Sequence, residues 1–429
     1  MSSKTKTTAA TEDARPALVP KLRFPEFFGT GSWEQKHIED FFNVGSSKRV
    51  LQQDWIAQGI PFYRTRELVS LSKNEPFSSE IFISKPLFEE ITQKYGAPRE
   101  GDFLISGVGT LGISYLVKKG DEFYFKDGNV IWFSRKGGIS SLFFKYCFES
   151  DVIQDQILKQ ASVSTVGTYT IQNAKITKFY CPPTEVEQQK IAECLSSVDE
   201  LMAGQARKVG ALKTHKKGLM QQLFPREGET QPRLRFPEFQ NVGEWKRMAL
   251  GQAAIFYNGR AYKQEELLES GKYPVLRVGN FFTSNAWYYS DLELDETKYC
   301  EKGDLLYAWS ASFGPRIWRG EKSIYHYHIW KVIEQRGIDK QFLFITLENE
   351  TENMKAKTTN GLGIMHITKG AIESWQSAFP TLVEQRKIAD CLTSLDNTIA
   401  AEIEKLDTLK SYKEGLMQQL FPSPDAIQS

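Results

Sequence analysis

The chain contains twice a stretch that decides its fold: Glu187-Gln188-Gln189-Lys190-Ile191-Ala192, which returns as Glu384-Gln385-Arg386-Lys387-Ile388-Ala389. The far end of the stretch, Gly218-Leu219-Met220-Gln221-Gln222-Leu223-Phe224-Pro225, returns letter for letter as residues 415–422. The two copies are offset by 197 residues without a gap, and 22 of the 39 positions from Glu187 to Pro225 are identical. Two unrelated helices do not share this many positions through composition, so the repeat decides the architecture.

Each copy has the start and stop signals of one long helix. Thr184 and Thr381 each lie three residues before a glutamate, which is the spacing of a capping box. A proline precedes each threonine and keeps the chain before it extended. Another proline, Pro225 or Pro422, closes each far end, where a helix does not easily continue. We predict long helices over 183–225 and 380–422.

Apolar residues in both copies recur every three or four positions, which is the pattern of a heptad seam. Both copies interrupt the seam at the same two steps, with Gln205 and Glu402 and then with Lys216 and Lys413. Shared polar interruptions favour helices that pair with each other, over the alternative in which each amphipathic helix lies on its own domain. The predicted helix-pair interface comprises Ile191, Leu195, Val198, Met202, Val209, Leu212, Leu219, Ile388, Leu392, Leu395, Ile399, Leu406, Leu409 and Leu416.

A second element is also duplicated. Leu22-Arg23-Phe24-Pro25-Glu26-Phe27, with Trp33 downstream, recurs as residues 234–239 with Trp245. The order is therefore short motif, variable region and long helix, and then the same three again. We predict a disordered tail over 1–21, variable domains over 22–182 and 226–379, the two helices, and a tail over 423–429. Short β-branched and aromatic runs such as 123–125, 130–133 and 324–333, separated by turn residues, predict strands. We also expect short helices over 84–95, 142–160 and 339–355, so both variable domains are predicted to have a mixed α/β, strand-rich fold.

Composition narrows the class of protein. The 429 residues have room for two to three domains, and 54 basic residues are balanced by 53 acidic ones. No run reaches the length of a transmembrane helix, and the first residues lack the apolar core of a signal peptide. The five cysteines form no CxxC pair. We expect a cytoplasmic protein without structural disulfides.

Two local motifs suggest a ligand site, but each has a structural interpretation that is favoured over it. Residues 107–112 match GxGxxG, but the run that follows is typical of a strand rather than of the helix that a dinucleotide site requires, so we expect a glycine loop. His326-Tyr327-His328 places two imidazoles on one face of a strand. Without a third ligand nearby, a packed or DNA-facing aromatic strand is favoured over a metal site. No P-loop, zinc-ligand set or amino-methyltransferase tetrapeptide is found, and we expect a non-catalytic chain.

The remaining candidates are loop residues with planar or hydroxyl hydrogen-bonding groups. Arg and Asn side chains form paired contacts with base edges, whereas Ser and Thr suit phosphates. The alternative for each of them is an ordinary polar surface loop. The candidates are Arg64, Thr65, Arg66, Ser106, Thr110, Thr165 and Tyr169 in the first domain and Arg277, Asn280, Ser310, Ser312, Arg316, Asn360 and His366 in the second.

From about Leu22 to Pro422, the ordered pattern resembles the DNA-specificity subunits of type I restriction-modification systems. The resemblance is carried by the two helix starts, by the Gly-Leu-Met-Gln-Gln-Leu-Phe-Pro endings, and by the runs 273–280 and 303–310. It implies two target-recognition domains that each read half of a bipartite site in double-stranded DNA. It also implies that the helices pair antiparallel and set a spacer, since 187–223 extends roughly 55 Å, or roughly 16 base pairs.

The same resemblance implies the partners. Two modification (methyltransferase) subunits would dock symmetrically and carry the S-adenosylmethionine chemistry, and restriction subunits would supply ATP-driven translocation and cleavage with Mg. This chain itself would hold no cofactor or metal. The alternatives from other classes are a fused single-chain methyltransferase or nuclease and a non-catalytic coiled-coil scaffold.

Overall fold

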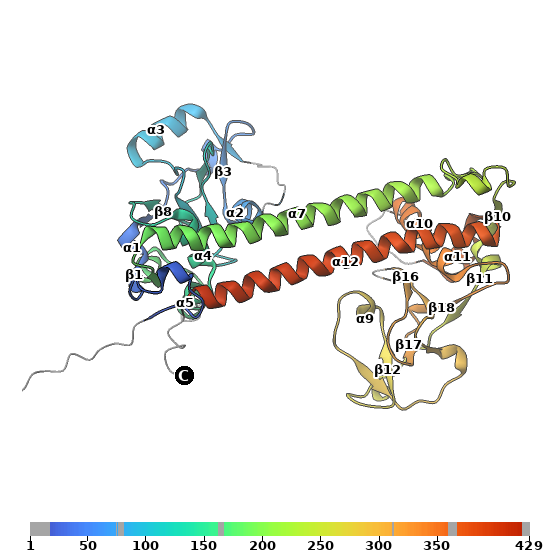
Figure 1. The fold of residues 1–429 in the computed structure, drawn as a ribbon. Helices are drawn as coiled ribbons and strands as arrows, with labels where there is room; N and C mark the ends of the chain where they lie inside the picture. The colour runs from blue at the N-terminus through green and yellow to red at the C-terminus, as the bar shows by residue number, and fades with distance from the viewer. Residues whose placement is uncertain are drawn as a thin grey trace, which may run out of the picture. The chain divides into compact units, whose positions relative to one another are not determined.

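The computed structural model describes residues 18–73, 75, 81–161, 167–310, 313–358 and 367–422. It divides into two compact units, Met1–Gln205 with Lys405–Ser429 and Ala206–Glu404. Each unit combines one strand-rich region with a part of each long helix, α7 (Glu185–Leu223) and α12 (Leu382–Leu420) (Figure 1). The predicted mixed α/β fold with two long helices is confirmed. The linear domain boundaries stay a prediction, because the compact units divide both helices in mid-length.

Over its described residues, the first unit contains three sheets with strand orders β2-β8-β5-β6, β4-β3-β7 and β1-β9. Its strands are β1 (Glu34–His37), β2 (Phe42–Gly45), β3 (Ile60–Tyr63), β4 (Phe82–Ile83), β5 (Phe103–Ser106), β6 (Ser114–Leu116), β7 (Tyr124–Phe125), β8 (Val130–Arg135) and β9 (Lys178–Cys181). Its shorter helices are α1 (Ile38–Phe41), α2 (Thr65–Ser72), α3 (Lys85–Tyr95), α4 (Ser141–Glu149), α5 (Asp151–Ala161) and α6 (Ile171–Ile176), with 3-10 turns η1 (Pro25–Phe27) and η2 (Gln52–Asp54).

The second unit repeats this plan with strand orders β11-β18-β15-β16, β13-β12-β17-β14 and β10-β19. Its strands are β10 (Lys246–Ala249), β11 (Ala254–Asn258), β12 (Tyr273–Leu276), β13 (Tyr288–Ser290), β14 (Tyr299–Cys300), β15 (Leu305–Ala308), β16 (Gly314–Ile317), β17 (Ser323–Tyr325), β18 (Ile329–Glu334) and β19 (Gln376–Phe379). Its shorter helices are α8 (Leu250–Ala253), α9 (Val278–Phe282), α10 (Lys340–Thr358) and α11 (Lys369–Ser374), with 3-10 turns η3 (Pro237–Phe239), η4 (Gln264–Glu266) and η5 (Glu296–Lys298).

Strand β5 of the first unit and strand β15 of the second, each an inner strand of a four-stranded sheet, are buried on both faces. In the first unit Phe103 of β5 packs against Phe144 of α4, with ring centroids 5.2 Å apart, while Leu104 faces a separate cluster with Leu68 of α2. In the second unit Leu305 and Leu306 of β15 divide in the same way between two clusters. Burial on both faces explains why these strands have continuous apolar runs instead of an alternating pattern.

The short helices and strands agree in part with those predicted from the sequence. A helix predicted over 84–95 is α3, for which the Ser84 side chain accepts the N-cap hydrogen bond from the Leu87 amide. The helix predicted over 142–160 is instead two helices that break at Ser150. The strand predicted over 324–333 is wrong in its middle, since residues 326–328 connect β17 to β18.

The duplicated short motif anchors the start of the long helix in each unit. The Arg23 guanidinium donates to both carboxylate oxygens of Glu187 at 2.8 Å, and the Trp33 indole donates to Oε1 at 3.1 Å. Arg235 and Trp245 make the same contacts with Glu384, at 2.7 and 3.2 Å. Both carboxylates are completely buried.

This anchor corrects the capping-box prediction. The Thr184 hydroxyl does accept the Glu187 amide hydrogen bond at 3.2 Å. However, the Glu187 and Glu384 side chains bind the distant arginine and tryptophan, because a buried carboxylate requires charge-paired donors. The glutamate three residues after the threonine is therefore a tertiary anchor.

The glutamine after each anchor glutamate ties the recognition domain to the helix. Gln188 accepts the Ser140 amide at 2.9 Å, immediately before α4. Gln385 accepts the Asp339 amide at 2.8 Å, immediately before α10. The repeated Glu-Gln pair thus fixes both the short motif and the recognition domain onto the start of the same helix.

The Leu-Phe-Pro ending of each helix packs in the unit that does not contain its own start. In the first unit Phe421 lies against Trp33 and Phe143, with ring centroids 6.4 and 5.7 Å apart. In the second unit Phe224 contacts Trp245 and Phe342, at 6.1 and 5.5 Å. Each unit is therefore completed by a segment from the other repeat, which explains why the endings are identical.

The two helices contact each other within each unit through repeat-equivalent ion pairs. Lys413 binds Asp199 at 2.7 Å in the first unit, and Lys216 binds Asp396 at 2.6 Å in the second. Lys208 is also paired, with Glu402 at 3.0 Å. From Lys208 to Lys216 the residue number on α7 rises, while the number of the partner on α12 falls from Glu402 to Asp396. The helices run antiparallel, and the two lysines that interrupt the predicted seam, Lys216 and Lys413, each form an ion pair across it.

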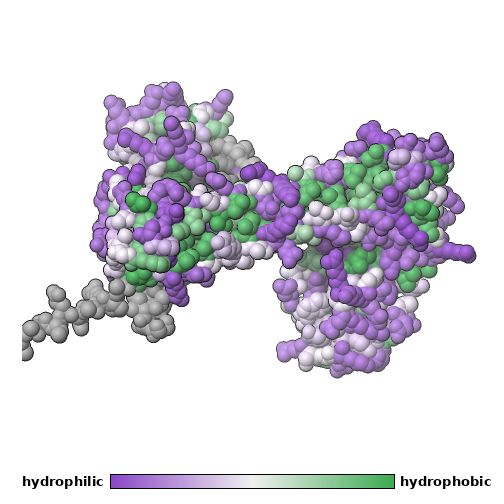
Figure 2. All heavy atoms as spheres, viewed as in Figure 1, coloured by the Kyte–Doolittle hydropathy of each residue, from purple (hydrophilic) through white to green (hydrophobic). Residues whose placement is uncertain are grey.

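All fourteen residues of the predicted helix-pair interface are buried or half-buried. Figure 2 shows the visible surface of the second recognition domain as mainly hydrophilic, with hydrophobic residues showing more along the long helices. Among the described residues, no helix combines the length and apolarity needed to cross a bilayer.

Candidate nucleic-acid interface

The strand ends of the second recognition domain meet at one edge. Strands β12 and β17 are parallel, so that Arg277 follows Leu276 beside the segment after Tyr325. The His326 amide donates to the Leu276 carbonyl at 2.9 Å, and the Trp309 amide donates to the His328 carbonyl at 3.0 Å. The loops that begin at 277, 309 and 326 are therefore adjacent.

The first recognition domain has the same arrangement of strand ends. The Lys126 amide donates to the Tyr63 carbonyl at 2.8 Å, and the Gly107 amide donates to the Asn129 carbonyl at 2.9 Å. Arg64 follows β3 there, as Arg277 follows β12. The backbone hydrogen bonds thus define equivalent edges in the two domains, although the side chains differ.

Arg64 and Arg66 share a buried carboxylate. The Glu67 side chain is nearly fully buried and accepts from Arg64 Nη2 and from Arg66 Nε, both at 2.6 Å. It also accepts the Arg64 amide at 2.9 Å. Burial opposes ionisation of Glu67, but the hydrogen bonds from the two arginines outweigh it and lower its pKa. The arginines are therefore held in place, with one negative charge between them.

Arg277 has a different set of partners. Asn280 accepts the Arg277 amide at 3.2 Å and donates to the Ala286 carbonyl at 2.8 Å. The Arg277 guanidinium lies 4.3 Å from the Tyr288 ring centroid. Its Nε is buried without a hydrogen-bond partner, and among the described residues no carboxylate pairs with it. Arg277 thus keeps its positive charge at the edge of the domain, positioned by an aromatic face.

Two candidates, Ser106 and Tyr169, do not fit a contact with DNA. The Ser106 hydroxyl is fully buried, accepts the Ile113 amide at 2.9 Å and donates to the Thr110 carbonyl. Tyr169 is also buried, with its hydroxyl 2.8 Å from the Thr177 hydroxyl, and burial raises its pKa. The Ser106 side chain thus holds the glycine loop, while the Tyr169 ring packs in the core and only its backbone amide bonds to Gly107. Both hydroxyls have internal partners, as buried hydroxyls require.

The other candidates vary in exposure. Thr110 and Arg316 are exposed, Ser310 is half-buried, and the hydroxyl of Thr65 is buried without a partner among the described residues. Arg316 lies on β16 rather than in a loop, and its guanidinium is 5.2 Å from the ring centroid of Phe282, the last residue of α9. Thr165, Ser312, Asn360 and His366 lie outside the described residues.

The glycine loop is confirmed as a connection between strands. Gly109 and Gly112 have φ angles of 80° and 70°, and β6 follows where a dinucleotide site would have a helix. At Gly107, a Cβ would lie 2.8 Å from the Tyr169 carbonyl oxygen. The loop is therefore glycine-rich so that two backbone segments approach closely.

The edge also contains aromatic residues outside the list of candidate DNA contacts, among them the segment 326–328 that was predicted to be packed or to face DNA. Tyr262, Trp309 and the segment 326–328 place their rings within 6.3 Å of a neighbour. For the segment 326–328, the sequence signal is the alternation of histidine and tyrosine between two strands. Among the described residues, no three metal-ligating side chains come together, so the imidazoles have no third ligand there.

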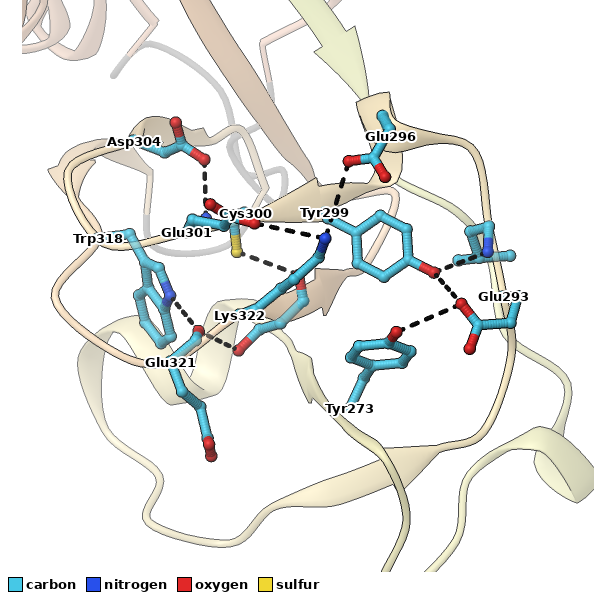
Figure 3. Close-up of polar contacts among 12 residues, drawn as sticks. Tyr273, Glu293, Glu296, Tyr299, Cys300, Glu301, Asp304, Trp318, Glu321 and Lys322 are labelled. Atoms are coloured by element: carbon cyan, nitrogen blue, oxygen red, sulfur yellow. Dashed lines mark hydrogen bonds and ion pairs between the residues drawn. The ribbon is translucent and has the colours of Figure 1, made fainter.

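Acidic side chains of the second domain form a polar network with two tyrosines and Lys322 (Figure 3). Glu293 accepts from the hydroxyls of Tyr273 and Tyr299, and Lys322 lies 3.3 Å from Glu301. Tyr273 begins β12, whereas Arg277 follows the end of that strand. The network therefore holds the small sheet together at the end opposite to Arg277, and its carboxylates do not neutralise the candidate edge.

Comparison with known proteins identifies the class. The profile of the type I restriction modification DNA specificity domain matches residues 31–214 and again 242–411. The chain therefore belongs to the type I restriction-modification specificity family, whose DNA-binding target-recognition domains correspond to the two strand-rich regions.

Several relatives are similar to this chain. The MjaVIII specificity subunit of Methanocaldococcus jannaschii is 29% identical over 44% of this chain and 43% of its own length. A putative specificity subunit of Haemophilus influenzae is 30% identical over 38% of this chain and 40% of its own length. The matched part thus spans less than half of either relative. The putative MjaX specificity subunit of M. jannaschii is 24% identical over 91% of this chain and 92% of its own length.

Solved structures share the fold. The S subunit of a type I restriction-modification system from M. genitalium superposes with a TM-score of 0.54 at 15% identity, over 95% of this chain and all of that one. A chain from a structure on complex assembly and conformational transition of the type I R-M system gives a TM-score of 0.58, also at 15% identity, over 90% and 97%.

Proposed function

We propose that this chain is the DNA-specificity subunit of a type I restriction-modification complex and that each recognition domain reads one half of a bipartite target. The observation that carries the proposal is that the two recognition domains have the same backbone arrangement at this edge but different loop side chains. The Lys126-to-Tyr63 and His326-to-Leu276 backbone bonds are equivalent, whereas the side chains beside them are different. Two recognition domains with a common backbone framework and different hydrogen-bonding side chains suit two different half-sites.

In this proposal the long helices set the distance between the half-sites. Each contains 39 residues, a rise of about 58 Å, which is the length of roughly 17 base pairs. The equivalent ion pairs Lys413–Asp199 and Lys216–Asp396 favour one register of the two helices. Inserting one heptad after Gly204 and another after Ala401 lengthens each helix by about 10 Å. The preferred spacer should then grow by roughly three base pairs, and an unchanged spacer would contradict this role.

The chain itself is proposed to be non-catalytic, and the chemistry to belong to its partners. Two modification subunits would bring S-adenosylmethionine, and restriction subunits would bring ATP and Mg. The buried anchors Arg23–Glu187 and Arg235–Glu384 are repeated, so the two halves of the chain have equivalent frameworks. Equivalent frameworks support symmetric docking, because each copy of a partner would then meet an equivalent surface.

A binding experiment tests the proposal. Fluorescence anisotropy with labelled duplexes should give tight binding of the chain with its modification subunit only when both half-sites are present at the correct spacing. Thermal unfolding of the chain alone should be unchanged by S-adenosylmethionine. Stabilisation by that cofactor would favour a single-chain methyltransferase, and sequence-independent binding would favour a scaffold.

A further inference from the structure

The connection between β17 and β18 presents a group of adjoining rings, tilted or edge-on to one another, at the edge of the second recognition domain. The Tyr327 side chain is 40% exposed, while His326 and His328 are half-buried. The Tyr327 ring centroid lies 4.4 Å from His326 and 3.9 Å from His328. Trp309, which follows β15, lies 4.9 Å from His328. The group is therefore a continuous, partly exposed surface of planar side chains.

The backbone holds this group firmly. The Tyr327 amide donates to the Arg260 carbonyl at 3.0 Å, and the Arg260 guanidinium is paired with Glu266 at 2.7 Å. At Gly259 a Cβ would lie 2.3 Å from the His326 carbonyl oxygen. Only glycine lets the two segments approach so closely, so the sequence at 259 is adapted to the position of the histidine segment.

The same backbone site in the first unit has another chemistry. Lys126, Asp127, Gly128 and Asn129 occupy the connection there, and the Arg49 Nε donates to Asp127 at 2.8 Å. A charged segment in one domain thus corresponds to an imidazole and phenol segment in the other. Positions that differ while the surrounding hydrogen bonds are kept are the positions at which the two domains are able to recognise different sequences.

We propose that His326, Tyr327 and His328, together with Arg277, form the base-reading surface of the second recognition domain. The inference rests on the proposed function and names the residues that give one half-site its sequence. A neutral imidazole offers one N–H donor and one acceptor, and a phenol offers a hydroxyl. Beside the Arg277 donors, these groups match the acceptors and donors on base edges.

The electrostatics favour bases over phosphates as the ligands of the histidines. Burial, with the nearby His328 and Arg277, lowers the pKa of His326 to about 4. Burial also lowers the pKa of His328. The charged and titratable groups around them are Arg277, the Arg260–Glu266 pair and Tyr262. Both imidazoles are neutral at physiological pH and so do not neutralise a phosphate.

The test uses the full chain with its modification subunit, after the wild-type target has been determined. His326→Ala and His328→Ala should each weaken binding to the cognate duplex by roughly fivefold or more. They should reduce discrimination among base substitutions in the second half-site alone. The dependence of affinity on salt should keep its wild-type slope, because no phosphate contact is lost. The matched control is His215→Ala, which changes an exposed histidine on α7 and should leave binding unchanged.

Preserved discrimination at the first half-site shows that a variant chain is folded and assembled. Equal weakening on all duplexes with a shallower salt dependence would make these residues phosphate contacts and overturn the inference. Unchanged discrimination at the second half-site would overturn it too. Absence of a two-part target for the wild-type complex would instead reject the proposed function, and the inference with it.

Discussion

The two recognition domains share a framework and differ at the ends of their strands. Both place an arginine directly after an inner strand of the small sheet. In both, the connection that follows the parallel neighbouring strand is bonded to the residue before that arginine, by Lys126 to Tyr63 and by His326 to Leu276. In the first domain Glu67 neutralises Arg64, and the adjacent connection is charged. In the second, Arg277 lies on Tyr288, and the connection is aromatic. The difference teaches that strand order and anchors are kept while the reading edge changes.

The largest effect should come from breaking the shared anchor. Glu187→Ala leaves Arg23 buried without its carboxylate, and Glu384→Ala does the same to Arg235. Each change should lower the free energy of unfolding of its own unit by about 3–5 kcal/mol, equally in the two units. Urea unfolding followed by hydrogen exchange in each unit measures this. Glu200→Ala, an exposed position on α7, is the control, and a loss below about 1 kcal/mol at either anchor would contradict the equivalence.

The next effect distinguishes the two arginines. Arg277→Ala should cost about 1–3 kcal/mol of binding at the second half-site and nothing at the first. Arg64→Ala should cost less at its own half-site, because Glu67 already occupies part of the Arg64 guanidinium. Competition binding with duplexes altered in one half-site gives both numbers. Arg336→Ala, an exposed arginine after β18, is the control, and equal losses for Arg64 and Arg277 would remove the contrast.

A smaller effect should appear in the helix pair. Lys216→Met and Lys413→Met each remove one of two equivalent, partly exposed ion pairs and should destabilise by about 1 kcal/mol or less. Because the pairs are equivalent, the two losses should match and should shrink as salt is raised. Thermal unfolding at low and high ionic strength measures them. A tenfold difference in equilibrium constant between the two variants would show that the helix contacts are not symmetric.

An effect of similar size is a pH dependence that arises in the second domain. The pKa of His326 falls from 6.5 to about 4 on folding, so the unfolded chain binds more protons between these values. The stabilising effect of the neutral imidazole is therefore present above pH 6.5 and declines as pH falls toward 4. Stability of the wild type should drop over this window by about 1 kcal/mol more than that of His326→Asn, after screening by solvent. Parallel pH curves for both chains would contradict the assignment.

Much of the framework was predictable because its signals are repeated. Residues 187–192 match residues 384–389 in register at every position except Gln189 and Arg386, which predicted the helices, and the shared interruptions Lys216 and Lys413 predicted that the helices pair. The role of Glu187 was not predictable, because local spacing indicated a cap while its true partner, Arg23, is 164 residues away. Long-range pairing of a buried charge leaves no local pattern.

The reading edge was harder to predict than the framework. Arg64, Arg277, Ser106 and Tyr169 were all selected as candidates for their side-chain chemistry, but the structure buries Ser106 and Tyr169. A hydroxyl-bearing residue is the same in the sequence whether it faces solvent or packs inside the domain, so only the backbone path decides. His326 and His328 were assigned to a strand, since β-branched and aromatic neighbours hid the connection between β17 and β18.

The most direct test of the central claim is single-molecule modification sequencing of DNA from cells that express this chain with its modification subunit. The account predicts a methylated two-part motif with a fixed gap, found only when the chain is present. His326→Ala should relax one part of that motif and leave the other part and the gap unchanged. A single uninterrupted motif, or no chain-dependent methylation beside an active modification subunit, would contradict the account.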